Sequence, residues 1–227
     1  MDERTAQSLA SSGLLDGVPR ELYEETLVKL KVREKSYLEG ELLLRLGSRP
    51  EAMGVVVDGY VRIDFYDDDG NASTITMVGR GGMFAEAVAC AGDPSIVQVQ
   101  AASDVRVLWL DMNRMMTGRV MRETPYVGVI MVNNVRMLAR KNTLLVRKLQ
   151  LLSQKRLRDR IKLYLVQRES GMLPKDTMAE QSRTSLARYL GADRSALSRE
   201  LGRLRDEGIV SLDGGTINIV DRSFLEN

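Results

Sequence analysis

Four polar side chains near residue 196 are of the types that read base pairs in a DNA groove: Arg194, Ser195, Ser198 and Arg199. An arginine offers a planar fork of donors that matches the acceptors of guanine, and serine can bond to several bases. Apolar residues between and after them recur at three- or four-residue spacing, namely Leu197, Leu201 and Leu204. This spacing predicts an amphipathic helix with one buried face. The polar face is then free to enter a major groove.

A second short amphipathic run precedes this helix, with Leu186, Ala187 and Leu190 on one face. Gly191 is expected to end it, since glycine accepts the left-handed conformation that closes helices. We expect Asp193 to cap the following helix with a side-chain oxygen. Two helices joined by so tight a turn indicate a helix-turn-helix. Packed helix pairs with a glycine turn also occur in all-α proteins that never bind DNA.

The surroundings of this motif favour DNA. A helix is predicted over 155–167, and a β-hairpin over 209–220 with its turn at Asp213-Gly214-Gly215. Helix, helix pair and hairpin in this order predict a winged helix-turn-helix. Residues 155–205 hold 13 basic and 6 acidic side chains, whereas residues 1–125 hold 14 and 20. A basic excess centred on the motif is what phosphate contacts require.

The first half of the chain shows a different pattern. The first 35 residues are predicted to be helical, and short hydrophobic runs then alternate with turn signals from Ser36 to Leu110. The turns at Asp58-Gly59 and Asp69-Gly70 indicate an all-β sandwich or barrel. Residues 79–95 form a glycine-rich turn followed by a short helix-like run. Such a turn could cradle an anion or simply cross the end of a barrel.

A long helix is predicted from Pro125 to Leu152, with the proline in its first turn. Residues 126–152 include no acidic side chain. A seam with coiled-coil spacing runs along it: Gly128, Met131, Val135, Leu138, Asn142, Leu145, Leu149 and Leu152. The seam predicts a paired helix, most simply in a parallel homodimer, with packing on the chain's own core as the alternative. Asn142, polar inside the seam, would fix the register at a cost in stability.

Composition excludes several classes of function. There is no histidine among the 227 residues, so hydrolytic triads and histidine-based metal sites are ruled out, and we expect no enzyme. A single cysteine, Cys90, cannot form an intramolecular disulfide, and its small apolar neighbours indicate a buried hydrophobe. No apolar run approaches the length of about 18 residues that spans a membrane, and we expect no signal peptide. We therefore expect a cytoplasmic protein that does not bind membranes.

A β-domain, a long helix and a winged helix-turn-helix, in this order, resemble the cAMP receptor protein/fumarate-nitrate regulator (CRP/FNR) family of bacterial transcription factors. The resemblance covers nearly the whole chain. Its most specific parts are Phe84-Ala85-Glu86, the strand glycines Gly40, Gly59, Gly70 and Gly82, and the segment GADRSALSRELGRLRDEGIV.

The resemblance implies an α+β fold in three parts. These are an effector-sensing β-barrel of the cyclic-nucleotide-binding jelly-roll type at 1–124, a dimerisation helix at 125–152 and a winged helix-turn-helix at 153–227. It also implies a homodimeric transcriptional regulator that binds double-stranded promoter DNA, responds to a small effector and contacts RNA polymerase.

Individual DNA contacts follow from the resemblance. Arg194 and Arg199 fall on arginines that the family uses in the major groove. Ser195 falls where many members carry a glutamate that accepts from cytosine, so the half-site is expected to differ from the family's best-known one. Arg183, Thr184 and Ser185 are better placed for phosphates.

The effector site departs from the family pattern. Members that bind cyclic nucleotide carry a glutamate, an arginine ten residues later, and then a serine or threonine. Glu86 is present to meet a ribose hydroxyl, but the other two positions are Ile96 and Val97. Because nothing would neutralise the cyclic phosphate, we expect neither cAMP nor cGMP to bind tightly.

What remains is an expected pocket of small and apolar groups: Phe84, Ala87, Val88, Ile96 and Val97. Lys141 and Asn142 align with residues that reach the effector in relatives. Such a pocket suits a small organic or aromatic ligand. An iron–sulfur cluster would need several cysteines, and haem would have to use Cys90 or a methionine, so no cofactor is expected. A regulator without a ligand, or a sensor that acts through protein partners, is the alternative.

Overall fold

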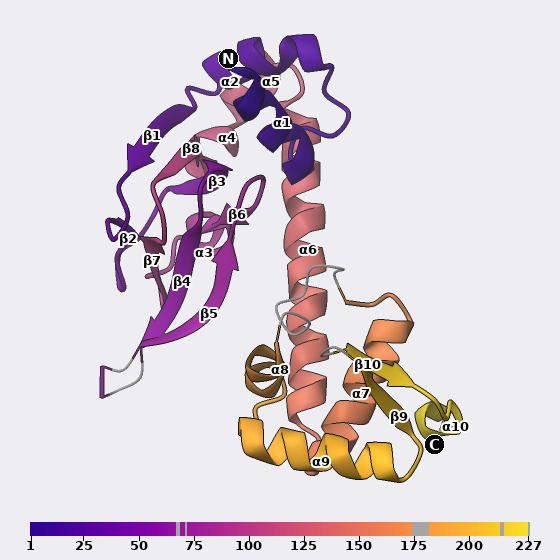
Figure 1. Cartoon of the computed structure of the whole chain (residues 1–227). Coiled ribbons are helices and arrows are strands. Elements are labelled where there is room, and N and C mark those ends of the chain that lie inside the picture. Colours follow the sequence, from indigo (N-terminus) through magenta and orange to yellow (C-terminus); the bar gives the residue numbers. More distant parts are fainter. Residues whose placement is uncertain (67–68, 71, 174–181, 214–215, 227) are drawn as a thin grey trace. The chain divides into compact units, whose positions relative to one another are not determined.

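The computed structural model describes residues 1–66, 69–70, 72–173, 182–213 and 216–226 (Figure 1). The chain divides into two compact units, Met1–Ala139 and Arg140–Asn227. The long helix α6, Val127–Leu152, begins in the first unit and ends in the second. No helix in the described ranges is long and apolar enough to cross a membrane.

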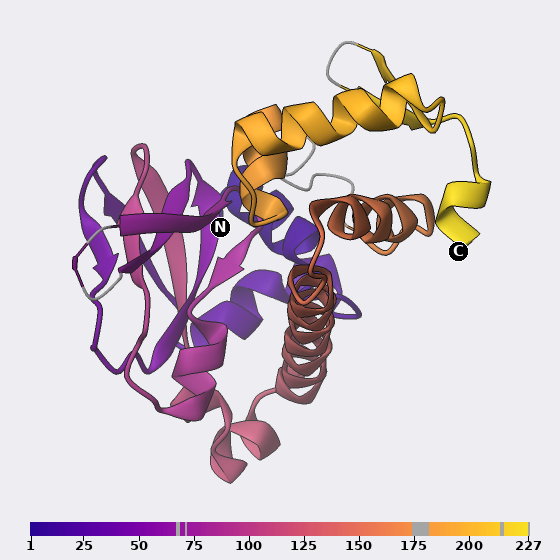
Figure 2. The same cartoon turned by 90° about the horizontal axis from the view of Figure 1, so that it is seen from below.

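Two four-stranded antiparallel sheets make up most of the first unit (Figures 1 and 2). One sheet has the order β1-β8-β3-β6, with bounds Arg33–Tyr37, Val105–Asp111, Ala52–Asp58 and Met83–Phe84. The other has the order β2-β7-β4-β5, with bounds Leu42–Leu44, Gln98–Ala101, Val61–Tyr66 and Ala72–Val78. This arrangement confirms the jelly-roll expectation.

One core lies between the two sheets, where Val56 and Val107 of the first sheet meet Val61 and Val99 of the second. The other face of the first sheet packs against helices α1 (Glu3–Ser12) and α2 (Tyr23–Lys29) and the start of α6. Residues 53–57 of β3 are therefore all buried, which explains why this strand shows no polar alternation in the sequence.

Gly54 permits the closest approach in this core. It pairs with Phe84 on one side and Trp109 on the other. A Cβ at Gly54 would overlap the Phe84 ring, which stands edge-on to Trp109 at a centroid distance of 5.3 Å. Glycine is thus required here because a neighbour occupies the space of a side chain.

The prediction that the first 35 residues are helical is wrong at its end. After α1, a 3-10 turn at Arg20–Leu22 and α2, the chain enters β1 at Arg33. Strand β1 pairs with β8 alone, and four of its five residues are exposed. An edge strand of this kind carries no hydrophobic alternation that a sequence pattern could reveal. The two-residue strand β6 was likewise not anticipated.

The long helix starts two residues later than predicted. Helices α4 (Met112–Met115) and α5 (Gly118–Glu123) lead to a turn at Pro125 and Tyr126, and α6 begins only at Val127. Tyr126 has a φ of 65°, which no right-handed helical residue adopts. Pro125 therefore precedes the helix instead of occupying its first turn.

The second unit surrounds one apolar cluster. Its elements are the end of α6, α7 (Leu157–Glu169), α8 (Arg183–Tyr189), α9 (Arg194–Asp206), the hairpin β9 (Val210–Asp213) and β10 (Thr216–Ile219), and α10 (Ser223–Glu226). Leu151, Leu165, Leu197 and Ile217 meet in the cluster. The order of elements confirms the predicted winged helix-turn-helix; Gly214 and Gly215 of its hairpin turn lie outside the described residues.

Candidate nucleic-acid interface and effector site

The turn between α8 and α9 is closed as the sequence predicts. Gly191 has a φ of 59°, and the Ala192 amide donates to the Ala187 carbonyl at 2.9 Å, which ends α8. A Cβ at Gly191 would lie 2.9 Å from Leu152 Cδ2, so a larger residue would have to displace the end of that side chain as well as adopt the left-handed conformation. Asp193 stands at the N-cap of α9 but makes no side-chain cap bond, so the predicted capping by Asp193 is wrong.

The two faces of α9 separate as predicted. Leu197, Leu201 and Leu204 are each at most 1% exposed. The predicted DNA-contacting side chains of α9 are all exposed and lie within two turns of the helix: Arg194, Ser195, Ser198 and Arg199. The fold therefore brings these four side chains together on one polar surface.

The arginines in and near α9 differ in whether they form ion pairs. Glu200 pairs with Arg203 at 3.2 Å and with Arg158 at 3.6 Å. Arg194 and Arg199, by contrast, form no ion pair or side-chain hydrogen bond with any residue that the structure describes. Their guanidinium donors are available to an external acceptor.

The side chains at the start of α8 are less accessible to DNA phosphates than the sequence predicts. Thr184 is exposed, but the Ser185 amide donates to Ser182 Oγ at 3.0 Å and the two hydroxyls are also 3.0 Å apart. Arg183 is half-buried, and its Nη1 is buried with no hydrogen-bond partner within the described ranges. Of the three predicted phosphate-contacting residues, Thr184 is thus the most accessible.

The predicted effector residues fall on several elements. Phe84 is 1% exposed and packs in the core between the sheets. Glu86 opens helix α3 (Glu86–Ala91) and is only 4% exposed, whereas Ala87 is exposed and Val88 half-buried. Strand β6 and α3 thus hold four of the predicted residues in one segment.

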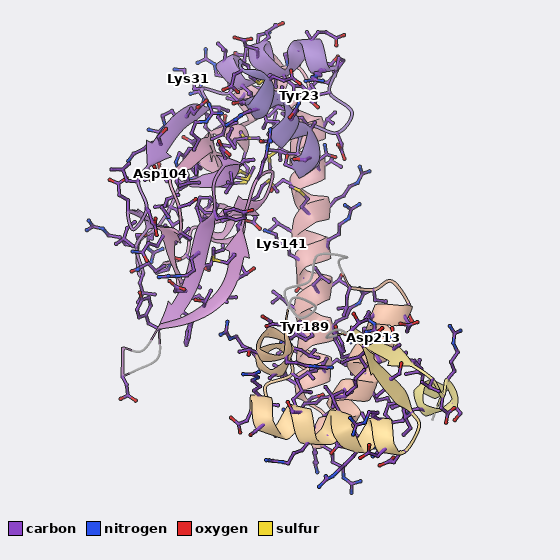
Figure 3. The ribbon with its side chains drawn as sticks, viewed as in Figure 1. Tyr23, Lys31, Asp104, Lys141, Tyr189 and Asp213 are labelled. Atoms are coloured by element: carbon purple, nitrogen blue, oxygen red, sulfur yellow. The ribbon has the colours of Figure 1, made fainter. Side chains whose placement is uncertain are left out.

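The remaining effector residues lie elsewhere. Ile96 is 70% exposed in the loop before β7, and Val97 beside it is half-buried. Lys141 and Asn142 are exposed residues of α6 and belong to the second unit (Figure 3 labels Lys141). Ile96 is therefore a solvent-facing side chain in the unit that contains Glu86.

Ala85 is the strained residue of this segment, which the sequence pattern did not reveal. It precedes α3 with a φ of 63° and a ψ of 3°. An L-residue with a Cβ pays roughly 1–2 kcal/mol in this left-handed conformation. The strain lies immediately before the buried carboxyl of Glu86.

We expect Ala85→Gly to raise the free energy of unfolding by about 1 kcal/mol, because the relief of strain exceeds the roughly 0.4–1 kcal/mol that the more flexible unfolded chain costs. Urea denaturation checks this. Ala91→Gly, the same exchange at the exposed last residue of α3, is the control and should lose up to about 1 kcal/mol. A loss of stability in both variants would contradict the assignment of strain to Ala85.

Part of the predicted seam of α6 is exposed to solvent in the single chain. Val135, Leu145 and Leu149 are 60%, 64% and 66% exposed. Val127 and Ile130, which are not seam positions, are at most 1% exposed and belong to the core of the first unit, and the seam residue Met131 packs partly against the same core. The predicted alternative, packing on the chain's own core, therefore applies to Met131 but not to Val135, Leu145 and Leu149.

Comparisons with known proteins agree with this architecture. The family model of the cyclic nucleotide-binding domain matches residues 34–117, and that of the Crp-like helix-turn-helix domain matches residues 159–227. The transcriptional regulator SdrP of Thermus thermophilus is 26% identical over 204 residues, which cover 86% of this chain and 94% of SdrP.

Two solved structures show the same fold. The catabolite activator protein of Thermus thermophilus has a TM-score of 0.56 and 24% identity, covering 94% of this chain and 96% of its own. The c-di-GMP-responsive global regulator CLP of Xanthomonas campestris has a TM-score of 0.56 and 20% identity, covering 87% of this chain and 99% of its own.

Proposed function

Because this chain is a member of the CRP/FNR family of transcriptional regulators, we propose that it binds promoter DNA as a homodimer under the control of a small effector. The observation that carries the proposal is the polar surface of α9. Arg194 and Arg199 are exposed there without an ion-pair partner in the described part of the chain. The regulator has no expected catalytic role, and RNA polymerase is its expected partner at a promoter.

The exposed part of the α6 seam supports the homodimer. Three large apolar residues of the seam are more than half exposed in the single chain, and residues 126–152 include no acid that could form the salt bridges of an ordinary surface helix. A second copy of α6 would bury these side chains in a symmetric, self-complementary contact. Two recognition helices could then enter major grooves about 34 Å apart, one turn of DNA.

The effector we propose is a small organic molecule other than cAMP or cGMP. Glu86 is retained, but Ile96 offers no charge to a cyclic phosphate. Isothermal titration calorimetry should therefore detect no cAMP binding at about micromolar dissociation constants, that is about −8 kcal/mol. Micromolar binding of cAMP would overturn this part of the proposal.

We propose that Cys90 does not ligate haem. Cys90 is partly buried, and its Sγ accepts a hydrogen bond from Asn134 Nδ2 at 3.7 Å. Burial raises the pKa of the Cys90 thiol. Because the thiolate is the form that ligates metal, this environment disfavours iron ligation by Cys90.

Selection from a pool of duplexes with a randomised central segment tests DNA binding. The full-length protein should enrich a palindrome, and its affinity for that duplex should fall by roughly 10³-fold or more between about 50 and 200 mM salt if six or more phosphates are contacted. Failure to enrich any duplex would contradict the proposed function and favour a sensor that acts through protein partners.

A further inference from the structure

The carbonyls at the end of α8 are bound by two cations from other helices. Lys148 Nζ of α6 donates to the Tyr189 carbonyl. Arg160 Nη1 of α7 donates to the Leu190 carbonyl at 3.1 Å and to the Gly191 carbonyl at 3.0 Å. The last carbonyls of a helix have no partner within it and carry its negative dipole end, so cations there are stabilising.

Lys148 is held in one place by more than this bond. Its Nζ lies 3.6 Å from the centre of the Tyr189 ring, and that ring meets Tyr164 edge-on at 5.9 Å (Figure 3 labels Tyr189). Burial lowers the pKa of Lys148 to about 8. A lysine that bears this desolvation cost is not an ordinary solvated surface residue; it contributes a specific contact between α6 and α8.

The last turns of α6 contribute side chains both to the core of the second unit and to the exposed seam. Leu151 is fully buried in the core of the second unit, and Leu152 Cδ2 occupies the space beside Gly191. Leu145 and Leu149, two residues of the seam, are 64% and 66% exposed. Arg160 also donates from Nε to the Gln154 carbonyl at 2.9 Å, which ties the end of α6 to α7. The α8–α9 turn is thus fastened to the helix that carries the seam.

We propose that Lys148 and Arg160 are positioning residues for DNA recognition, fixing the α8–α9 turn on the end of α6. In a dimer paired through the seam, the separation of the two α9 helices then follows the pairing of α6. The expected effect on DNA binding rests on the proposed function, because a fixed separation of the two α9 helices matters only if the dimer binds two half-sites together. Neither residue needs to touch DNA.

The test varies the spacing between the half-sites of the palindrome enriched from the duplex pool. Each added base pair moves one half-site by about 3.4 Å along the axis. The wild-type protein should prefer one spacing sharply. Lys148→Met, of similar length but uncharged, should lose about tenfold in affinity at that spacing, the effect of one charge-assisted hydrogen bond. Its penalty for changing the spacing by one base pair should fall to less than about threefold.

Two control variants accompany Lys148→Met. Lys148→Arg keeps a donor and a charge and should retain the wild-type spacing preference. Lys155→Met removes the same charge from an exposed lysine beyond α6 and should keep that preference as well. The slope of affinity against salt should be unchanged in Lys148→Met, because a lost phosphate contact would lower it by about 1.

Hydrogen exchange of the free protein tests the fastening without DNA. The Gly191 and Ala192 amides should exchange about tenfold faster in Lys148→Met, while the amides within α9 keep their wild-type rates. A wild-type spacing profile in Lys148→Met, or unchanged exchange at these amides, would overturn the inference. A wild-type protein that enriches no duplex while the exchange rates change as expected would instead count against DNA binding alone.

Discussion

Leu149→Glu should convert the homodimer into monomers, raising its dissociation constant at least about 100-fold, or about 2.8 kcal/mol. Leu149 is 66% exposed in the single chain and follows Asn142 by one heptad in the seam. In a symmetric pair the two glutamates would face each other across an apolar contact, where desolvation and like charge both oppose association. Sedimentation equilibrium of the wild-type and variant proteins measures the change.

The consequence for DNA should be larger than the loss of any single contact. A monomer binds one half-site only. In the dimer, once one half-site is bound, the second is bound as an intramolecular event, and a monomer loses this gain in affinity. We therefore expect the affinity of Leu149→Glu for the full palindrome to fall by on the order of 10²-fold or more. Its affinity for an isolated half-site should stay near that of the wild-type protein.

Val28→Glu is the matched control for this variant. Val28 on α2 is 70% exposed, so the substitution introduces the same charge at an equally exposed apolar position outside the seam. It should leave both the dimer and DNA binding intact. A Leu149→Glu protein that remains dimeric would show that the copies associate through another surface.

The helices and strands that were predicted correctly have either regularly spaced hydrophobic residues or a clear turn signal in the sequence. Helix α9 shows leucines at helical spacing, and the strands around Asp58-Gly59 show hydrophobic runs bounded by a turn. Strand β1, Arg33–Tyr37, was not predicted because it is a polar edge strand. Its hydrogen bonds to β8 connect residues more than 60 positions apart. No local pattern specifies such a pairing.

The features of the candidate site also fall into those that a local sequence pattern predicts and those that it does not. The exposure of Arg194 and Arg199 follows from the helical period alone. The half-buried state of Arg183, the strain at Ala85 and the bond from Lys148 to the Tyr189 carbonyl depend on the packing of distant segments. From the sequence alone, Lys148 would be predicted to be an ordinary solvated lysine on a long helix. Only the fold places Tyr189, 41 positions away, against its amine.

Arg199→Ala should weaken binding to the enriched palindrome by roughly 5- to 150-fold in each half-site, the equivalent of about 1–3 kcal/mol for one bidentate contact to guanine. Arg199 is exposed on α9 and has no ion-pair partner among the residues that the structure describes, so its removal breaks no described ion pair or side-chain hydrogen bond of the free protein. The loss should therefore appear in DNA binding and not in the free energy of unfolding. Fluorescence anisotropy with the palindrome and with single-base variants of it measures both affinity and specificity.

Two further variants separate base reading from general attraction. Arg199→Lys keeps the charge but loses the planar fork, so it should lose most of the discrimination at one base pair per half-site while keeping the salt dependence of the wild-type protein. Arg119→Ala removes an exposed arginine, paired with Glu123, from α5 in the other unit and should change neither. If Arg199→Ala instead weakened binding to every duplex equally and lowered the salt slope by about 1, Arg199 would be a phosphate contact and another residue of α9 would have to read the bases.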